Sequence, residues 1–226
     1  MDKQEAFRVQ NSILSGLEKK VLVWLSLRLP RWLTSDHLTG IGLLGAFIAG
    51  GGYVLSNWGR EFLWLSSFGF VVNWFGDSLD GTLARVRNKQ RPTYGFYLDH
   101  NIDAITALII TVGAGISPFV SFSVAMLILV GYYLLSIFTY INTYLKGTFK
   151  ISYFNLGPTE FRIIIIMLNA LFVILPMKNP PVVVLEITIK LFDLFALGVA
   201  LVLLMVYFFY FFTEKKKYEK EDPPLF

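Results

Sequence analysis

The most informative part of the chain reads Asp77-Ser-Leu-Asp80-Gly-Thr-Leu-Ala-Arg85 and, after nine further residues, Gly95-Phe-Tyr-Leu-Asp99-His-Asn-Ile-Asp103. These segments place four carboxylates within 27 residues. The first pair is three residues apart and the second pair four, so each pair shares one face if its segment is helical. Two such faces that meet would form an oxygen-rich pocket, and oxygen ligands suit hard divalent cations.

The composition indicates an integral membrane protein. Of the 226 residues, 55% are apolar and only 16% are charged, against roughly 25% charged residues in soluble domains. Apolar runs flank the aspartates, from about Phe62 to Phe75 and from Asp103 to Val112. A carboxylate in the hydrocarbon costs about 2.5 to 3.5 kcal/mol on insertion scales, and bound metal facing water is the simplest compensation. Cysteine is absent, which excludes thiolate chemistry and disulfides.

The apolar pattern predicts an all-α integral membrane fold with six transmembrane helices preceded by an amphipathic surface helix. Residues 1–33 contain that juxtamembrane helix, at about 10–33; a helix packed on a partner subunit is the alternative. Residues 34–213 form the catalytic transmembrane domain, and residues 214–226 a charged cytoplasmic tail. We expect the spans at about 38–56, 61–79, 96–117, 120–145, 157–175 and 185–212. Pro92 and Gly95 should break the helix between the second and third spans.

The distribution of charge predicts the orientation in the membrane. Six spans place both termini on one side, which the aspartate loop shares. Of the 20 Lys and Arg residues, all but Arg60, Lys178 and Lys190 fall on that side. By the positive-inside rule, the active site and both termini face the cytoplasm. We therefore attribute the net charge of +4 to orientation and contact with membrane lipids, and expect no nucleic-acid partner.

The residues beside the aspartates favour phosphoryl transfer. Gly81 and Ala84 remove side-chain bulk from the face that carries the acids and leave space for a ligand. Arg85 and the basic loop after it supply positive charge for phosphates. Metal-binding carboxylates with small residues and an arginine are typical of reactions on a diphosphate. Two rivals remain from other classes: a membrane cation or proton transporter that uses the intramembrane acids, and a noncatalytic scaffold.

The arrangement Asp-x-x-Asp-Gly-x-x-Ala-Arg, Gly, Asp-x-x-x-Asp closely resembles the signature of the CDP-alcohol phosphotransferase family, membrane enzymes of phospholipid synthesis. One departure is the nine-residue gap between Arg85 and Gly95, where eight residues are usual in the family. The resemblance implies transfer of a substituted phosphate from a CDP-linked donor to an acceptor hydroxyl, with release of CMP. It also implies two divalent cations, Mg²⁺ or Mn²⁺, and a homodimer.

The resemblance assigns a role to each matching position. Asp103 would be the base that deprotonates the acceptor hydroxyl. The metal ligands would be Asp77, Asp80, Asp99 and Asp103. The CDP moiety would be bound by Thr39, Asp80, Gly81, Ala84, Arg85 and Gly95.

The identity of donor and acceptor separates two branches of the family. His100 and Glu160 resemble features of the choline and ethanolamine phosphotransferase branch, where a histidine and a glutamate at these positions are thought to activate diacylglycerol. On that basis we expect a CDP-ethanolamine or CDP-choline type of donor and a diacylglycerol type of lipid acceptor. Arg162 instead resembles the anion-binding arginines of phosphatidyltransferases. The alternative is therefore a CDP-diacylglycerol-dependent enzyme with a polyol or polyol phosphate acceptor, such as inositol or glycerol phosphate.

Overall fold

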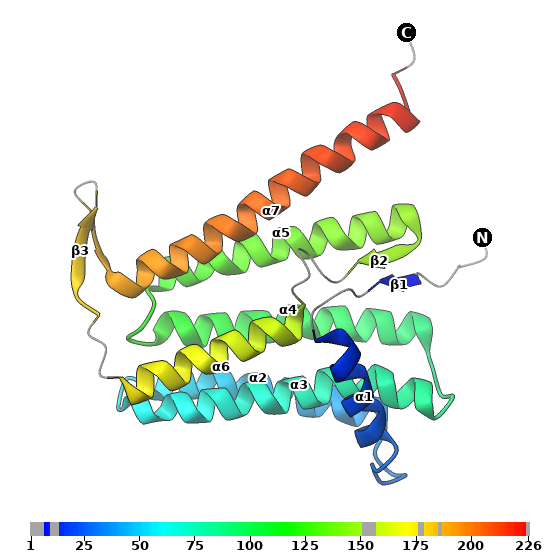
Figure 1. The fold of residues 1–226 in the computed structure, drawn as a ribbon, viewed down its shortest axis with the longest axis horizontal. Coiled ribbons are helices and arrows are strands. Elements are labelled where there is room, and N and C mark those ends of the chain that lie inside the picture. The colour runs from blue at the N-terminus through cyan, green and yellow to red at the C-terminus, as the bar shows by residue number, and fades with distance from the viewer. Residues whose placement is uncertain (1–6, 10–13, 151–156, 176–178, 185–186, 225–226) are drawn as a thin grey trace.

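The computed structural model describes residues 7–9, 14–150, 157–175, 179–184 and 187–224. Helices make up most of these residues (Figure 1), which confirms the expected all-α class. The helices are α1 (Ser15–Ser26), α2 (Ser35–Leu55), the 3₁₀ turn η1 (Arg60–Phe62), α3 (Leu63–Val86), α4 (Pro92–Ile116), α5 (Phe122–Lys146), α6 (Pro158–Ile174) and α7 (Leu191–Glu221).

Two short strand pairs join these helices. β1 (Phe7–Val9) pairs in parallel with β2 (Thr148–Lys150). β1 precedes the expected surface helix, and β2 falls between the spans expected at 120–145 and 157–175. β3 (Pro181–Val184) and β4 (Ile187–Lys190) form an antiparallel hairpin where the sixth span was expected to begin. β-branched residues dominate this hairpin and favour strand geometry, so the last helix begins only at Leu191. Residues 151–156 and 176–178, which belong to the connections on either side of the span expected at 157–175, lie outside the described residues.

The closest helix pair is α2 and α3, which run side by side along the bottom of Figure 1. Small residues permit this approach: a Cβ added to Gly45 would lie 2.7 Å from the Cα atom of Asn73, and one added to Gly76 would lie 2.6 Å from the Cα atom of Gly42. Asn73 also donates a 2.9 Å hydrogen bond to the carbonyl oxygen of Gly42. The tight contact fixes the part of α3 that carries the first two aspartates.

Helix α1 lies across the end of the bundle and packs against α3 (Figure 1). Its Leu22 joins an apolar cluster made by the α1–α2 linker, α2 and α3, with members Leu22, Leu33, Leu38, Leu79 and Leu83. Leu17, Trp24 and Leu27 are exposed. The helix is shorter than the predicted 10–33. Its location on a membrane surface stays a prediction.

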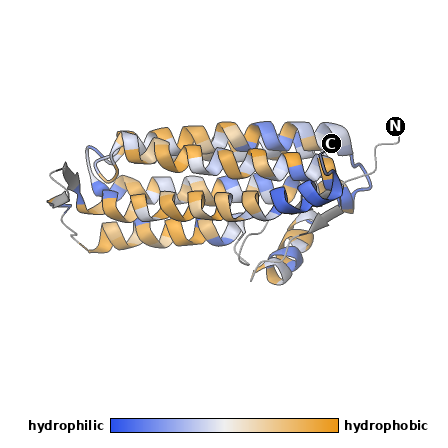
Figure 2. Ribbon diagram, turned by 90° about the horizontal axis from the view of Figure 1, so that it is seen from above, coloured by the Kyte–Doolittle hydropathy of each residue, from blue (hydrophilic) through white to orange (hydrophobic). Residues whose placement is uncertain are grey.

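Three helices in the described part of the chain are long and apolar enough to cross a membrane: α2, α5 and α7. Helix α6 has only 17 residues, while the acids and neighbouring polar residues of α3 and α4 lower their hydropathy. The six-span count therefore stays a prediction. Figure 2 shows that hydrophilic residues gather at one end of the bundle, the end at which the described chain termini lie.

The expected break between the second and third spans is present, because α3 ends at Val86 and α4 begins at Pro92. Two details differ from the prediction. Pro92 forms the first turn of α4, where its missing N–H is harmless, and Gly95 lies inside that helix, so Gly95 breaks nothing. The expected tail from residue 214 continues α7 as a helix to Glu221. The expectation that both aspartate pairs lie on helices is confirmed.

Candidate active site

Three of the four aspartates meet at one point. Asp77 of α3 and Asp99 and Asp103 of α4 each offer a carboxylate oxygen, and these oxygens all lie within 4.8 Å of one another. All three residues are half-buried. Carboxylates gathered in this way fit a hard divalent cation, which when bound would neutralise phosphate charge and polarise a phosphoryl oxygen.

Asp80 contacts the start of α2. Its carboxylate accepts a 2.7 Å hydrogen bond from the hydroxyl of Thr39 and a 2.5 Å hydrogen bond from the backbone N–H of Gly81. Its backbone carbonyl accepts from the hydroxyl of Ser35 at 2.9 Å. Thr39 and Asp80, both predicted to contact the CDP moiety, are thus neighbours. The metal role of Asp80 stays a prediction.

Arg162 brings positive charge into the acidic site from α6. Its Nη2 lies 2.6 Å from Oδ2 of Asp77, and the two side chains are only 14% and 24% exposed. A guanidinium has five N–H donors, so one group can hold Asp77 and also bind an anion. The sequence had indicated Arg162 as a candidate, but a partner 85 residues away was not foreseen.

The remaining predicted CDP contacts lie near the C-terminal end of α3 and the N-terminal end of α4. Arg85 donates a 3.1 Å hydrogen bond to the hydroxyl of Thr82, and a Cβ added to Gly81 would lie 3.3 Å from Nη1 of Arg85. Ala84 is half-buried on the same helix. A Cβ added to Gly95 would meet no atom within 4 Å. Open space beside Gly95 and the Arg85 guanidinium suit a nucleotide diphosphate, a role that stays a prediction.

His100 lies beside the acidic group and contacts two aromatic rings. Its ring stacks on Phe96 at 4.1 Å between centroids and meets Tyr140 edge-on at 4.7 Å. Its Nδ1 lies 2.8 Å from the carbonyl oxygen of Phe96 and 3.8 Å from Oδ2 of Asp99. These contacts orient the ring. The predicted role of His100 in activating the acceptor is not tested by them.

Both carboxylate oxygens of Glu160 bind backbone N–H groups. Oε2 accepts from Gly157 at 3.0 Å, which caps α6, and Oε1 accepts from Leu14 at 2.8 Å, just before α1. The residue is buried, and it is not part of the three-aspartate group. These bonds join α6 to α1, and the catalytic role predicted for Glu160 stays a prediction.

Sequence reasoning overlooked Glu18. Its Oε1 accepts hydrogen bonds from Nε1 of Trp74 at 2.9 Å, from the hydroxyl of Thr159 at 2.5 Å and from the hydroxyl of Ser78 at 3.4 Å. The one available signal was that Glu18 is the acidic residue of a helix that otherwise carries lysines. The partners come from α3 and α6, which also supply Asp77 and Arg162.

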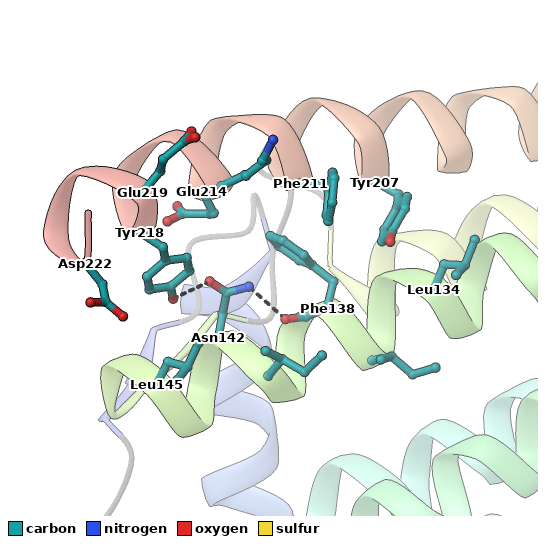
Figure 3. A pocket seen from close by; sticks show the side chains of 13 residues that line it. Leu134, Phe138, Asn142, Leu145, Tyr207, Phe211, Glu214, Tyr218, Glu219 and Asp222 are labelled. Carbon is teal, nitrogen blue, oxygen red and sulfur yellow. Dashed lines mark hydrogen bonds between the residues drawn. The ribbon is translucent and has the colours of Figure 1, made fainter. Parts of the chain in front are cut away.

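A separate groove lies between α5 and the end of α7 (Figure 3). It measures about 540 Å³ and none of the four aspartates lines it. Among its lining residues, the hydroxyl of Tyr218 donates a 2.9 Å hydrogen bond to Asn142, whose amide donates in turn to the carbonyl of Phe138. The groove is therefore distinct from the candidate active site.

The chain belongs to the CDP-alcohol phosphatidyltransferase family, whose sequence profile matches residues 27–211. It is thus a membrane enzyme that transfers substituted phosphate groups, as the resemblance implied. Among curated proteins it is similar to an archaetidylinositol phosphate synthase of Pyrococcus horikoshii, with 31% identity over 140 residues, which cover 62% of this chain and 70% of the relative.

Proposed function

We propose that this protein transfers a phosphatidyl-type group from a CDP-linked lipid to a hydroxyl of a polyol phosphate such as inositol phosphate. This choice takes the phosphatidyltransferase alternative over the CDP-ethanolamine or CDP-choline donor expected from the sequence. The name of the Pyrococcus horikoshii relative supports it. The observation that carries the proposal is the contact of Arg162 with Asp77, which holds a guanidinium at the three-aspartate group.

The charge of the acceptor explains why Arg162 favours this branch. A site built from carboxylates repels an anionic acceptor, so a polyol phosphate needs fixed positive charge nearby. Guanidinium groups bind phosphate through paired, charge-assisted hydrogen bonds. Diacylglycerol is neutral and offers no anion to such a group. His100 and Glu160, on which the other branch depends, make packing contacts and backbone hydrogen bonds that are sufficient reason for their presence.

The proposed reaction is a displacement at phosphorus. The acceptor hydroxyl oxygen forms a bond to the phosphorus distal to cytidine, the bond from that phosphorus to the CMP oxygen breaks, and CMP leaves with the electron pair. Asp103 receives the hydroxyl proton. The expected metal ligands are Asp77, Asp80, Asp99 and Asp103, and the expected CDP contacts are Thr39, Asp80, Gly81, Ala84, Arg85 and Gly95.

The proposal includes the membrane arrangement expected from the sequence. Six spans, an active site and both termini at the cytoplasmic face, two Mg²⁺ or Mn²⁺ ions and a homodimer are its parts. The gathering of hydrophilic residues at one end of the bundle supports a single polar face that holds the site (Figure 2).

The deciding experiment measures CMP release by the purified protein in mixed micelles with Mg²⁺ or Mn²⁺. One arm supplies CDP-diacylglycerol or its diether counterpart with inositol phosphate, inositol or glycerol phosphate. The other arm supplies CDP-choline or CDP-ethanolamine with diacylglycerol. We expect CMP in the first arm only. Release in the second arm alone would overturn the proposal and make His100 and Glu160 the acceptor-activating pair.

A variant of Arg162 tests the acceptor assignment. We expect Arg162→Gln to raise the KM for inositol phosphate about tenfold, the equivalent of roughly 1.4 kcal/mol, because a charge-assisted contact with the phosphate is lost. The KM for uncharged inositol should change far less. Arg60→Gln, on a turn outside the site, serves as the matched control. An equal loss with both acceptors would contradict phosphate recognition by Arg162.

A further inference from the structure

Glu18 ties three helices together through one oxygen atom. Its Oε1 receives the indole N–H of Trp74 and the hydroxyl of Ser78, both on α3, and the hydroxyl of Thr159 on α6. Glu18 itself lies on α1, outside the helices that carry the aspartates. The side chain is half-buried, so these bonds are shielded in part from competing water.

The partners of Glu18 flank the ion pair of the site. Ser78 directly follows Asp77, and Thr159 lies one helical turn before Arg162. Helices α3 and α6 are therefore connected twice within about one helical turn. The 2.6 Å contact between Arg162 and Asp77 joins them directly, and Glu18 joins them through its hydrogen bonds. A shift or rotation of α6 that broke the bonds to Glu18 would also move the guanidinium relative to Asp77.

A second carboxylate, that of Glu160, also links α6 to α1. Glu160 of α6 accepts the backbone N–H of Leu14 at 2.8 Å, at the start of α1. An acid of α1 thus reaches α6, and an acid of α6 reaches α1. Leu22 adds apolar contact with α3 residues of the core cluster.

We propose that Glu18 is a positioning residue for the acceptor site: it holds the start of α6 against α3 so that the Arg162 guanidinium stays at the three-aspartate group. This inference rests on the proposed function, in which Arg162 binds the acceptor phosphate. In this role Glu18 acts through its hydrogen bonds with Thr159 and the α3 side chains.

The chemistry predicts which replacements matter. All three bonds need only an acceptor oxygen, which glutamine retains and alanine lacks. In Glu18→Ala the indole N–H and the Thr159 hydroxyl lose their acceptor, and partly buried donors without a partner destabilise the contact. Glu18→Gln should keep the contact with weaker, uncharged bonds. Lys19→Ala changes an exposed neighbour on the same helix and is the control.

The first test measures the α3–α6 separation without any substrate. The chain has no cysteine, so Val71→Cys and Phe161→Cys, both at side chains 48% exposed, can carry a pair of nitroxide labels. We expect a narrow distance distribution in the parent and in Lys19→Ala, a broadened or shifted one in Glu18→Ala, and recovery in Glu18→Gln. Thr159→Val removes the α6 donor alone and should reproduce the broadening even if Glu18→Ala fails to fold.

The second test compares the KM for the acceptor with the KM for the donor. Glu18→Ala should raise the KM for inositol phosphate about tenfold and leave the KM for the CDP-linked donor unchanged, with Glu18→Gln close to the parent. A purely structural role would lower the amount of active enzyme and leave both KM values alone.

The outcomes separate this inference from the proposed function. An unchanged distance in Glu18→Ala and Thr159→Val overturns the positioning role whatever the acceptor is. A changed distance with an unchanged acceptor KM overturns the link to the acceptor. If the parent enzyme uses no polyol phosphate, the proposed function fails, while the distance measurement still decides whether Glu18 positions α6.

Discussion

At Gly95, the open space around the backbone gives a direct test of the nucleotide site. An added Cβ would touch no atom within 4 Å, and alanine is the better helix former by about 1 kcal/mol. We therefore expect Gly95→Ala to fold at least as well as the parent. If CDP approaches this backbone, the same change should raise the KM for the CDP-linked donor about tenfold.

The control for this prediction is Gly40→Ala, at a second helical glycine with nothing within 4 Å. Donor KM and thermal midpoint are measured for both variants in the same detergent. A Gly95→Ala enzyme with unchanged donor KM would place the cytidine diphosphate elsewhere.

Spacing along the sequence predicted part of the site at the level of single residues. The three- and four-residue intervals correctly placed each aspartate pair on a helix, and Asp77, Asp99 and Asp103 do converge. The spacing did not predict the partner of Asp80, whose carboxylate accepts a hydrogen bond from Thr39 of α2, because a helical interval reports a shared face and not the neighbouring helix. Glu18 and its partner Thr159 are 141 residues apart, and no local pattern reports such a contact.

At the level of elements, the α2–α3 contact should be the least tolerant of added volume. A Cβ at Gly45 would meet backbone atoms of Asn73 and the carbonyl oxygen of Gly69, the latter at 2.8 Å. Neither can move without separating the helices. We expect Gly45→Ala to lower the free energy of unfolding by roughly 1 to 3 kcal/mol, as overpacked cores do.

Gly51→Ala on the same helix is the matched comparison, since its added Cβ meets nothing within 4 Å. Thermal unfolding in detergent should rank Gly45→Ala below the parent and Gly51→Ala at or above it. Equal midpoints for the two variants would mean that α2 and α3 are not packed this closely.

The contact between the ends of α5 and α7 should depend on pH. Burial alone would raise the pKa of Glu214, but hydrogen bonds from Lys146 and Lys217 outweigh it and lower the pKa below its usual value of 4.5. A carboxylate with a lowered folded-state pKa stabilises the fold above its unfolded pKa, and that stability is lost as the pH falls through the folded value.

We therefore expect the parent to be more stable than Glu214→Gln at pH 6, and this difference to shrink as the pH falls below about 4.5. Thermal midpoints of both proteins across this range give the measurement. A difference that is constant with pH would show that Glu214 contributes no charge-dependent contact.

Element boundaries were predicted less well than element types. Apolar runs locate the middle of a buried helix, but its ends depend on capping and on tertiary contacts. The helix does break before Pro92, but the next helix begins at Pro92 itself and not near Phe96, because a proline suits the first turn of a helix. Charged residues beyond Phe212 were taken as a tail, yet Glu214 and Tyr218 contact α5 and extend α7.

For the whole molecule, hydropathy predicted an all-helical membrane protein and the aspartate motif predicted an enzyme, and the fold and family match agree. The predicted number of six spans does not follow from the hydropathy of the helices, because α3 and α4 contain both apolar residues and the acids of the site. The polar residues of the site lower the mean hydropathy of α3 and α4. By length and composition, therefore, only α2, α5 and α7 among the described helices qualify as candidate spans. Orientation in the membrane therefore needs its own experiment.

The absence of cysteine makes that experiment direct. Single cysteines are introduced at Trp58 (75% exposed, between α2 and α3), at Lys89 in the α3–α4 loop and at Lys216 near the end of α7. Each variant is labelled with a membrane-impermeant maleimide in intact cells and again after permeabilisation. The positive-inside rule predicts that Trp58→Cys reacts in intact cells, whereas Lys89→Cys and Lys216→Cys react only after permeabilisation.

Each result has a specific consequence. Lys89 belongs to the basic loop beside the candidate site, so labelling there in intact cells would move the site to the outer face and away from cytoplasmic nucleotides. Labelling of Lys216→Cys alone in intact cells would mean an odd number of crossings between the two positions, because α4, α5, α6 and α7 together should return the chain to its starting side. Since Lys89 and Lys216 bracket these four helices, labelling of both from the same side requires an even number of crossings between them, as four spans would give.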